Sequence, residues 1–420
     1  MKKAKVVLSV VLAIIALLTL SVVYVAAATE EGVEGYYSFT KFNSKVTITD
    51  VDPTISGEVV VPATLDGCDV VTIDEYAFEG CDKVTSITVP DGISTIKRGA
   101  FKGMTALESV TLPHVGNSAS STGTSGTFGY VFDYTSAETE GTIKQGDYYY
   151  FIPETIKSVT ITSDASIADY AFSEMKNLES VQFASVTSVG NYAFRNCSAL
   201  TELPLSASLE SIGSYAFENV SNITELVVPD SVTSIGKGAF KGLNKLSSVT
   251  VPFVGSSSSA TGYSGAFGYI FDYTTSSGVS GTTEQYSGYY YYLPTSIKTI
   301  TVTKDTDIPD YAFRNCVNIT SVETKAAKTI GSYAFANCEK LINIGLNEEI
   351  TKIGDYSFQN CKSVLSIELP NTVTSVGSYA FSGNSNVTEL TLPSSLKTIG
   401  DYAFQNLSLV TELVVPDSVI

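Results

Sequence analysis

A regularly spaced phenylalanine constrains the fold of this 420-residue chain more than any other feature. The repeated residues, ten of which follow alanine, are Phe78, Phe101, Phe172, Phe194, Phe217, Phe240, Phe313, Phe335, Phe358, Phe381 and Phe404. Successive gaps are 22 or 23 residues, except for two gaps of 71 and 73 residues. A period in the twenties is the signature of a solenoid, whose short units bury their apolar faces only against neighbouring units. The spacing therefore predicts a repeat solenoid.

Each unit contains an expected strand of the form Leu-x-x-Ile-x-Val-Pro, as in residues 223–229. Alternating apolar residues give the strand one buried face, and the proline ends it because proline has no N–H to donate. The expected strands start at residues 84, 107, 156, 178, 200, 223, 246, 297, 319, 341, 364, 387 and 410, which makes about 13 rungs. At about 4.8 Å per rung the ladder would be roughly 60 Å long.

A second segment, Ile-Gly-x-Tyr-Ala-Phe, precedes each strand. Its glycine slot also holds Pro309, whose φ is fixed near -65°, so the slot is expected to be the first position of a short helical turn rather than a left-handed residue. Two residues after the phenylalanine stands Gly or Asn, with Glu174 as the exception. Because Gly and Asn tolerate the left-handed conformation, we expect the turn to end there. The phenylalanine is then the main core residue of each rung.

Five of the six cysteines occupy one repeat position, three residues after the phenylalanine. They are Cys81, Cys197, Cys316, Cys338 and Cys361, and other repeats place Met, Val or Leu there. Cysteine in an apolar slot behaves as a small hydrophobic residue, so buried free thiols are predicted. Cys68 lies outside the pattern and could pair with Cys81 or stay free.

The repeat resembles the BspA-like leucine-rich repeats of bacterial and some protist surface proteins. The carrying motif is Ile-Gly-x-Tyr-Ala-Phe-x-Asn-Cys-x-x-Leu-x-x-Ile-x-Leu-Pro, best kept at residues 353–370, and the resemblance covers residues 71–420. It implies a right-handed leucine-rich-repeat array, mainly β with short helical turns. It also implies export to the cell surface, a role in adhesion or partner binding, and no catalytic residues.

The N-terminus has the pattern of an export signal. Lysines 2, 3 and 5 precede an apolar run and a small-residue site at residues 26–28, so residues 1–28 are expected to be a signal peptide. The apolar run is also long enough for an uncleaved membrane anchor. Residues 29–70 are expected to form an N-terminal cap with strands at 45–49 and 58–61, before a repeat domain at 71–420. Residues 411–419 repeat residues 224–232, so the array is expected to be truncated at Ile420.

Two inserts, residues 113–153 and 252–294, interrupt the period and are copies of each other. They hold 13 of the 25 tyrosines, and tyrosine-rich runs favour protruding β-hairpins. Binding surfaces favour tyrosine, whereas the Ser/Thr-rich strand face lacks aromatic residues, so the inserts are the predicted binding site. The candidate residues are Tyr130, Phe132, Tyr134, Tyr148, Tyr149, Tyr150, Tyr269, Phe271, Tyr273, Tyr289, Tyr290 and Tyr291. The alternative is that these aromatic residues pack on the flank of the solenoid.

The net charge and the motifs present in the sequence disfavour several classes of function. The net charge of -18 becomes -21 without the three leader lysines, which disfavours nucleic acid and favours a basic or neutral partner. The single histidine, His114, stands where the second insert has Phe253, so packing is expected rather than catalysis or zinc binding. No phosphate-loop or EF-hand pattern is present, and no cofactor is expected. The prediction is a non-enzymatic, secreted or cell-surface protein that binds an extracellular protein. The alternatives are glycan binding by the inserts, or a scaffold arm of a larger enzyme.

Overall fold

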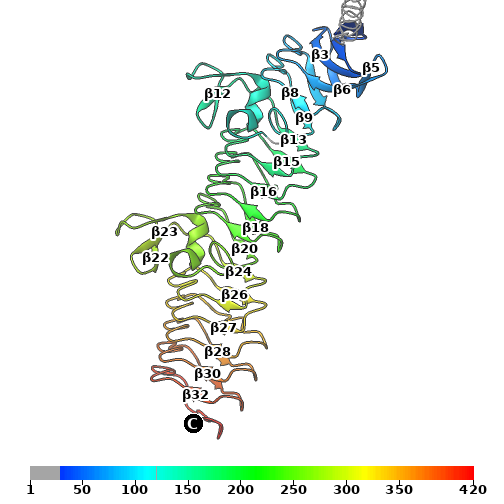
Figure 1. Cartoon of the computed structure of the whole chain (residues 1–420). Coiled ribbons are helices and arrows are strands. Elements are labelled where there is room, and N and C mark those ends of the chain that lie inside the picture. The colour runs from blue at the N-terminus through cyan, green and yellow to red at the C-terminus, as the bar shows by residue number, and fades with distance from the viewer. Residues whose placement is uncertain (1–28, 120) are drawn as a thin grey trace, which may run out of the picture.

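The computed structural model describes residues 29–119 and 121–420, so the expected signal peptide at residues 1–28 lies outside the described residues. The chain forms a long solenoid that begins with a small sheet at the blue end, and both inserts project from the same side of it (Figure 1). Within the described ranges, no helix combines the length and hydropathy needed to cross a membrane. The predicted fold class, a repeat solenoid with two hairpin-bearing inserts, is confirmed.

Ten of the 13 expected strands form, each within its predicted segment. The first parallel sheet contains β4 (Gly57–Val60), β7 (Val84–Thr88), β9 (Ser109–Leu112), β13 (Ser158–Ile161) and β15 (Ser180–Phe183). The second contains β18 (Glu225–Val227), β20 (Ser248–Val251), β24 (Thr299–Val302) and β26 (Ser321–Thr324), and the third pairs β29 (Ser366–Glu368) with β31 (Glu389–Thr391). Equivalent residues pair in register, so the rungs stack directly.

The expected strands at residues 200, 341 and 410 do not form. Pro204 occupies the middle of the first of these segments, where a strand residue would need an N–H donor for the sheet. Gly345 has a φ of 20° in the second segment, which keeps only an isolated bridge between Ser321 and Asn343. The sheet is therefore broken twice, once beyond each insert.

A second set of very short parallel strands runs along another flank and was not predicted. One group contains β14 (Ser166–Ile167), β16 (Ser188–Val189), β17 (Ser211–Ile212) and β19 (Ser234–Ile235). The other contains β25 (Asp307–Ile308), β27 (Thr329–Ile330), β28 (Lys352–Ile353), β30 (Ser375–Val376) and β32 (Thr398–Ile399), while β8 (Thr95–Ile96) pairs with a cap strand. Two residues per rung are too few for alternation to reveal a strand in the sequence.

The expected short helical turns are wrong. The Tyr-Ala-Phe segments form consecutive tight turns, because the tyrosine adopts a left-handed conformation, as at Tyr192 (φ 57°) and Tyr215 (φ 56°). A left-handed residue cannot continue a right-handed helix. The left-handed position after the phenylalanine is confirmed at Asn219 (φ 62°), and even Glu174 adopts it (φ 68°).

Glycine is preferred at its slot because of close packing between rungs, not because the slot begins a helical turn. A Cβ atom on Gly213 would lie 2.5 Å from the carbonyl carbon of Gly190 in the preceding rung, and one on Gly236 would lie 2.3 Å from the nitrogen of Ser214. Neither glycine has a positive φ. Glycine is needed because consecutive rungs approach too closely for a side chain.

The core is a column of stacked phenylalanine rings, as predicted. Phe194 and Phe217 are fully buried and lie 5.3 Å apart between ring centroids, nearly parallel at 6°. All six cysteines are free, so the Cys68–Cys81 pair does not form, and the five repeat cysteines are buried. Burial raises the pKa of the Cys361 thiol to about 12, so the thiol stays protonated and inert.

At the N-terminal end, β1 (Glu30–Glu34), β2 (Tyr37–Phe42) and β3 (Lys45–Val51) form an antiparallel sheet. β3 also pairs in parallel with β6 (Cys68–Ile73), to which β5 (Thr64–Leu65) is joined. The two strands expected here appear as β3 and β4. Because β4 pairs with β7, this end is continuous with the first rung.

Each insert contains two 3-10 helices and a three-stranded antiparallel sheet. The first has η1 (Gly123–Gly126), η2 (Phe128–Phe132), β10 (Tyr134–Thr135), β11 (Ile143–Gln145) and β12 (Tyr148–Tyr150). The second has η3 (Gly262–Gly265), η4 (Phe267–Phe271), β21 (Tyr273–Thr274), β22 (Thr283–Tyr286) and β23 (Tyr289–Tyr291). The predicted hairpins are β11–β12 and β22–β23; the third strand and the 3-10 helices were not expected.

Candidate binding site

Four of the twelve candidate residues are not available to a partner. Phe132 and Phe271 are fully buried because the insert supplies the rung that is missing from the phenylalanine column. Phe132 lies 6.2 Å from Phe101, and Phe128 continues the column 5.3 Å from Phe172. The prediction that Phe132 and Phe271 bind a partner is therefore wrong.

Tyr150 and Tyr291 are also fully buried. Each ring packs on a glycine of the insert, and a Cβ atom on Gly129 would lie 2.4 Å from the Tyr150 ring. The hydroxyl of Tyr150 donates to the Thr124 carbonyl at 3.3 Å, and that of Tyr291 donates to the Tyr263 carbonyl at 2.6 Å. These two tyrosines hold the hairpin on the insert rather than contact a partner.

The other eight candidate residues are half-buried. In the first insert, Tyr134 packs against Tyr130 and Tyr148, and the guanidinium of Arg98 lies 4.2 Å from its ring centre. The second insert repeats this cluster, with Lys237 Nζ 4.1 Å from the ring centre of Tyr273. The remaining half-buried candidates are Tyr149, Tyr269, Tyr289 and Tyr290. Most of the predicted tyrosines thus pack on the solenoid flank, which was the alternative interpretation.

Beneath the first hairpin lies a groove of about 700 Å³. Its lining includes the apolar residues Ile156, Met175 and Leu178, which are almost fully buried, so the exposed surface of the groove is mainly polar. The charged residues that line it are Glu138, Glu154, Glu174, Lys144, Lys176 and Arg195. Tyr149 of the hairpin and Tyr170 of the rung below add aromatic surface, so Tyr149 is the one predicted residue in this groove.

The corresponding place beneath the second hairpin is almost closed, with a cavity of only about 40 Å³. Its lining includes Pro294, Ile297, Cys316 and Ile319, which correspond by sequence to Pro153, Ile156, Met175 and Leu178 of the first groove, and it contains no charged residue. Two copies of one insert on one solenoid therefore differ in whether they leave an open groove.

The first cause of the difference is a residue in the rung below the hairpin. In the second copy, Asn315 Nδ2 donates to the Glu284 carbonyl of β22 at 2.5 Å and ties the hairpin to the solenoid. In the first copy this position is Glu174, whose ionised side chain can only accept hydrogen bonds. Glu174 instead accepts from Asn196 Nδ2 at 2.6 Å. The first hairpin lacks this tie, and its buried Gln145 Nε2 donates to the Ser173 carbonyl of the rung at 3.5 Å.

The second cause is one extra residue in the second hairpin. After the buried Gln285 the chain reads Tyr286-Ser287-Gly288, whereas after the equivalent Gln145 it reads Gly146-Asp147. Both glutamines accept from an insert backbone, Gln145 from Gly129 N at 2.9 Å and Gln285 from Gly268 N at 2.6 Å, so the two hairpins are anchored alike up to that point. The ring of Tyr286 then packs against Tyr311, while Gly146 places no side chain against Tyr170.

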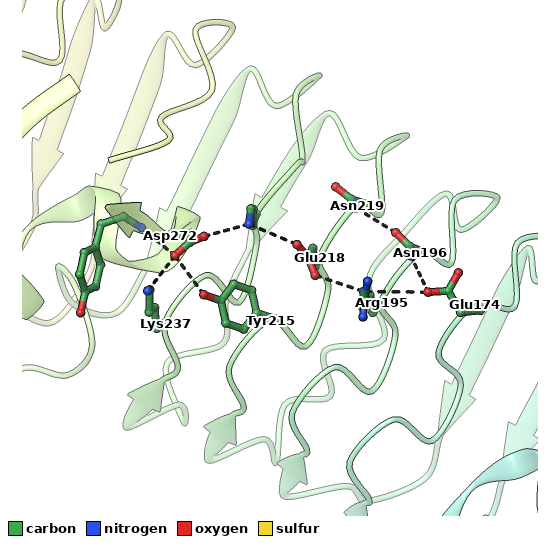
Figure 2. A network of polar contacts seen from close by, with 10 residues as sticks. Glu174, Arg195, Asn196, Tyr215, Glu218, Asn219, Lys237 and Asp272 are labelled. Carbon is green, nitrogen blue, oxygen red and sulfur yellow. Dashed lines mark hydrogen bonds and ion pairs between the residues drawn. The ribbon is translucent and has the colours of Figure 1, made fainter. Parts of the chain in front are cut away.

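Charged side chains connect the first groove to the second insert (Figure 2). Arg195 Nε lies 3.9 Å from Glu174 Oε1 and 3.3 Å from Glu218 Oε2. Lys241 Nζ lies 3.4 Å from Glu218 Oε1 and 2.9 Å from Asp272 Oδ2. Arg195 therefore lies between two carboxylates at the edge of the groove.

Asp272 anchors the second insert to the rung below it. Lys237 Nζ lies 3.1 Å from its Oδ1, and the hydroxyl of Tyr215 donates to it at 3.0 Å (Figure 2). Burial alone would raise the pKa of Asp272, but hydrogen bonds from Lys241, the Tyr273 backbone and Lys237 outweigh burial and hold the pKa below its usual value. Asp133 has the same role in the first insert, with Arg98 at 2.7 Å.

A second pair of acids lies at the base of the inserts. Asp164 and Asp305 are 3% exposed, and each accepts a hydrogen bond from an insert backbone, Val115 N at 2.6 Å and Val254 N at 2.7 Å. Their other carboxyl oxygens are buried without a partner. Burial raises the pKa of each to about 7. His114 is buried with neither ring nitrogen hydrogen-bonded and burial lowers its pKa, which fits the predicted packing role.

The groove residues other than Tyr149 were missed from the sequence. Gly146, Glu174 and Arg195 each belong to a repeat or a turn and carry no motif of their own. The available signal was the difference between the two insert copies, Gln145-Gly146-Asp147 against Gln285-Tyr286-Ser287-Gly288. Among residues 29–119 and 121–420, no group of His, Cys, Asp and Glu side chains is arranged to hold a metal ion.

The fold defines a leucine-rich-repeat solenoid, and comparison with known families agrees. A family model described as the BspA type leucine rich repeat region matches in six copies over residues 67–166, 142–267 and 282–420. The chain belongs to this family, as the sequence resemblance indicated. Leucine-rich repeat proteins of this kind are generally non-enzymatic binding proteins.

Two solved bacterial leucine-rich repeat structures are similar over most of their length. A leucine-rich repeat protein from Bacteroides ovatus is 20% identical, with 92% of this chain and 93% of that chain covered and a TM-score of 0.32. A leucine rich cell surface protein from Faecalibacterium prausnitzii is 22% identical, with 91% and 94% covered and a TM-score of 0.31. A search among curated proteins found no match.

Proposed function

We propose that this protein is exported, displayed at the cell surface, and binds an extracellular protein or glycan without catalysis, with the groove beneath the first insert as its binding site. The observation that carries the proposal is the contrast between an open groove of about 700 Å³ and its nearly closed copy of about 40 Å³. Binding pockets typically measure ~300–1,000 Å³ and combine an apolar lining with a few placed polar groups. The volume of the first groove lies in this range and that of the second does not, although the lining of the first groove is mainly polar and charged.

The charge of the groove also supports a binding role. Lys144 and Lys176 have no carboxylate within 4.0 Å in the part of the chain that the structure describes, and Lys144 Nζ lies 5.5 Å from the ring centre of Tyr149, so neither cation is paired with an acid of the groove. The acidic residues Glu138 and Glu154 line the same groove. The groove thus offers both signs of charge, which favours a protein surface over a uniformly anionic polymer.

The test is to close the first groove with the second insert's own residues. The closing variant carries Glu174→Asn and replaces Gly146 and Asp147 with Tyr-Ser-Gly, the three residues that follow Gln285. We expect it to lose binding to the extracellular proteins or glycans that the unchanged protein retains, measured by biolayer interferometry on a panel of each.

The matched control opens the second groove instead. This opening variant carries Tyr286→Ala and Asn315→Glu and should keep all of the binding. If the closing variant binds as well as the unchanged protein, the site lies elsewhere, with the strand face as the remaining candidate. Export is tested separately by N-terminal sequencing of the protein recovered from the outside of a bacterial host, where a mature chain that starts at residue 29 is expected.

A further inference from the structure

The second insert shows what fills the space beneath a hairpin when the groove is closed. Tyr286 lies edge-on to Tyr311, with 5.4 Å between ring centroids and 82° between ring planes. This edge-to-face arrangement is one that aromatic pairs prefer. The other face of Tyr311 is covered by Tyr333 at 5.1 Å, so Tyr286 completes the end of a tyrosine stack.

The first insert has the same stack without its terminal ring. Tyr170 is stacked on Tyr192, with 5.0 Å between ring centroids and 6° between ring planes. On the side of the hairpin, a Cβ atom placed on Gly146 would lie 3.6 Å from Cδ2 of the Tyr170 ring. A side chain at this place would therefore point at Tyr170, and glycine supplies none.

We propose that the groove beneath the first insert binds an aromatic side chain, that of a tyrosine or phenylalanine on a partner protein, at the place that Tyr286 fills in the second insert. This inference rests on the proposed function and specifies its ligand. The partner ring lies edge-on to Tyr170, beside Gly146 of the hairpin.

The surrounding charges define the flanking residues of the partner. In this proposal Lys144 and Lys176 bind carboxylates next to the aromatic residue of the partner, and Glu138 and Glu154 bind cations. Arg195 is already paired with Glu174 and Glu218, so it positions the edge of the groove. A glycan ring could also stack on Tyr170, but the molecule itself places an aromatic ring there in the second copy, and this favours the aromatic ligand.

The test uses small probes on the full mature protein. Saturation-transfer NMR titrations with N-acetyltyrosinamide, N-acetylleucinamide and cellobiose compare the unchanged protein with the closing and opening variants. We expect N-acetyltyrosinamide to bind the unchanged protein roughly 2- to 10-fold more tightly than N-acetylleucinamide, since an aromatic pair adds roughly 0.5–1.5 kcal/mol beyond its buried area. The closing variant should lose this binding, and the opening variant should bind twice as many probes per chain.

Equal binding of the tyrosine and leucine probes, or preferential binding of cellobiose, would overturn the aromatic-ligand proposal. It would also be overturned if the closing variant bound the tyrosine probe unchanged. These outcomes are separate from the proposed function, because loss of a macromolecular partner by the closing variant would still place binding in the groove. Thermal unfolding of each variant confirms that the fold is kept.

Discussion

The two inserts share their buried halves and differ where they face solvent. Both complete the phenylalanine column, both bury a tyrosine and a glutamine beneath the hairpin, and both are tied to the rungs by a buried aspartate. Only the second is closed by Asn315 and Tyr286, while the first has Glu174 and Gly146. The comparison shows that the two inserts keep the same core and differ at two positions, which we propose decide whether a groove remains.

The largest expected loss of stability comes from the buried phenylalanines that both inserts add to the core. Phe132→Ala and Phe271→Ala should each destabilise the protein by about 3 to 5 kcal/mol, because each removes a fully buried ring from the column. Urea unfolding of the two variants measures the loss. A loss below about 1 kcal/mol in either would show that this insert does not belong to the core.

The second-largest expected loss of stability comes from disturbing the packing of each hairpin on its insert. Gly129→Ala and Gly268→Ala should each cost about 1 to 3 kcal/mol, because the added Cβ would lie 2.4 Å from atoms of Tyr150 or Tyr291. Gly92→Ala is the control, since nothing lies within 4 Å of the position of its Cβ atom and its φ is not positive. If unfolding midpoints of the Gly129 and Gly268 variants differ widely, the two inserts are not packed alike.

The buried aspartates predict a pH dependence shared by both inserts. Burial raises the pKa of Asp164 and Asp305 to about 7, far above the ordinary value of about 4 in an unfolded chain. Between these values the folded protein binds more protons than the unfolded chain, so stability falls as the pH rises from about 4 to 7. The hydrogen bonds from Val115 and Val254, which favour the charged form, oppose burial, and the neighbouring Asp307 adds to the shift at Asp305.

Thermal unfolding between pH 5 and pH 8 measures this effect. The unfolding midpoint should be higher at pH 5, and the slope should flatten in the double variant Asp164→Asn and Asp305→Asn. A midpoint whose pH dependence is the same in the double variant would contradict the assignment of this titration to the two aspartates.

The smallest expected effect concerns the hydrogen bond from Asn315 to the Glu284 carbonyl, which only the second insert has. Asn315→Asp keeps the shape but removes the donor to the Glu284 carbonyl, so it should cost about 1 kcal/mol and loosen the second hairpin. Glu174→Asn should have the opposite effect on the first hairpin. Hydrogen exchange of β11–β12 and β22–β23 measures both, and unchanged exchange in the two variants would remove this tie as the cause of the difference.

The period alone was enough to predict the phenylalanine column and the buried cysteines, because a core residue recurs in every rung at one position. It did not predict the close approach at Gly213 or the left-handed Tyr215, because both follow from how one rung lies on the next. Pro204 broke an expected strand, and the sequence already contained that warning.

The repeat pattern could not predict the groove either, because the groove depends on how one insert differs from the other. The tyrosine count marked both inserts equally, yet Phe132 and Tyr150 are core residues and only Tyr149 lines the groove. What opens the groove is a missing side chain at Gly146 and a missing donor at Glu174. Such absences become visible only when the two copies are compared in three dimensions.

The most direct measurement is the number of N-acetyltyrosinamide molecules bound per chain in three proteins that differ only in these groove positions. The account predicts one for the unchanged protein, none for the closing variant and two for the opening variant. The same number in all three would contradict the claim that Glu174 and Gly146 make the first insert a binding site.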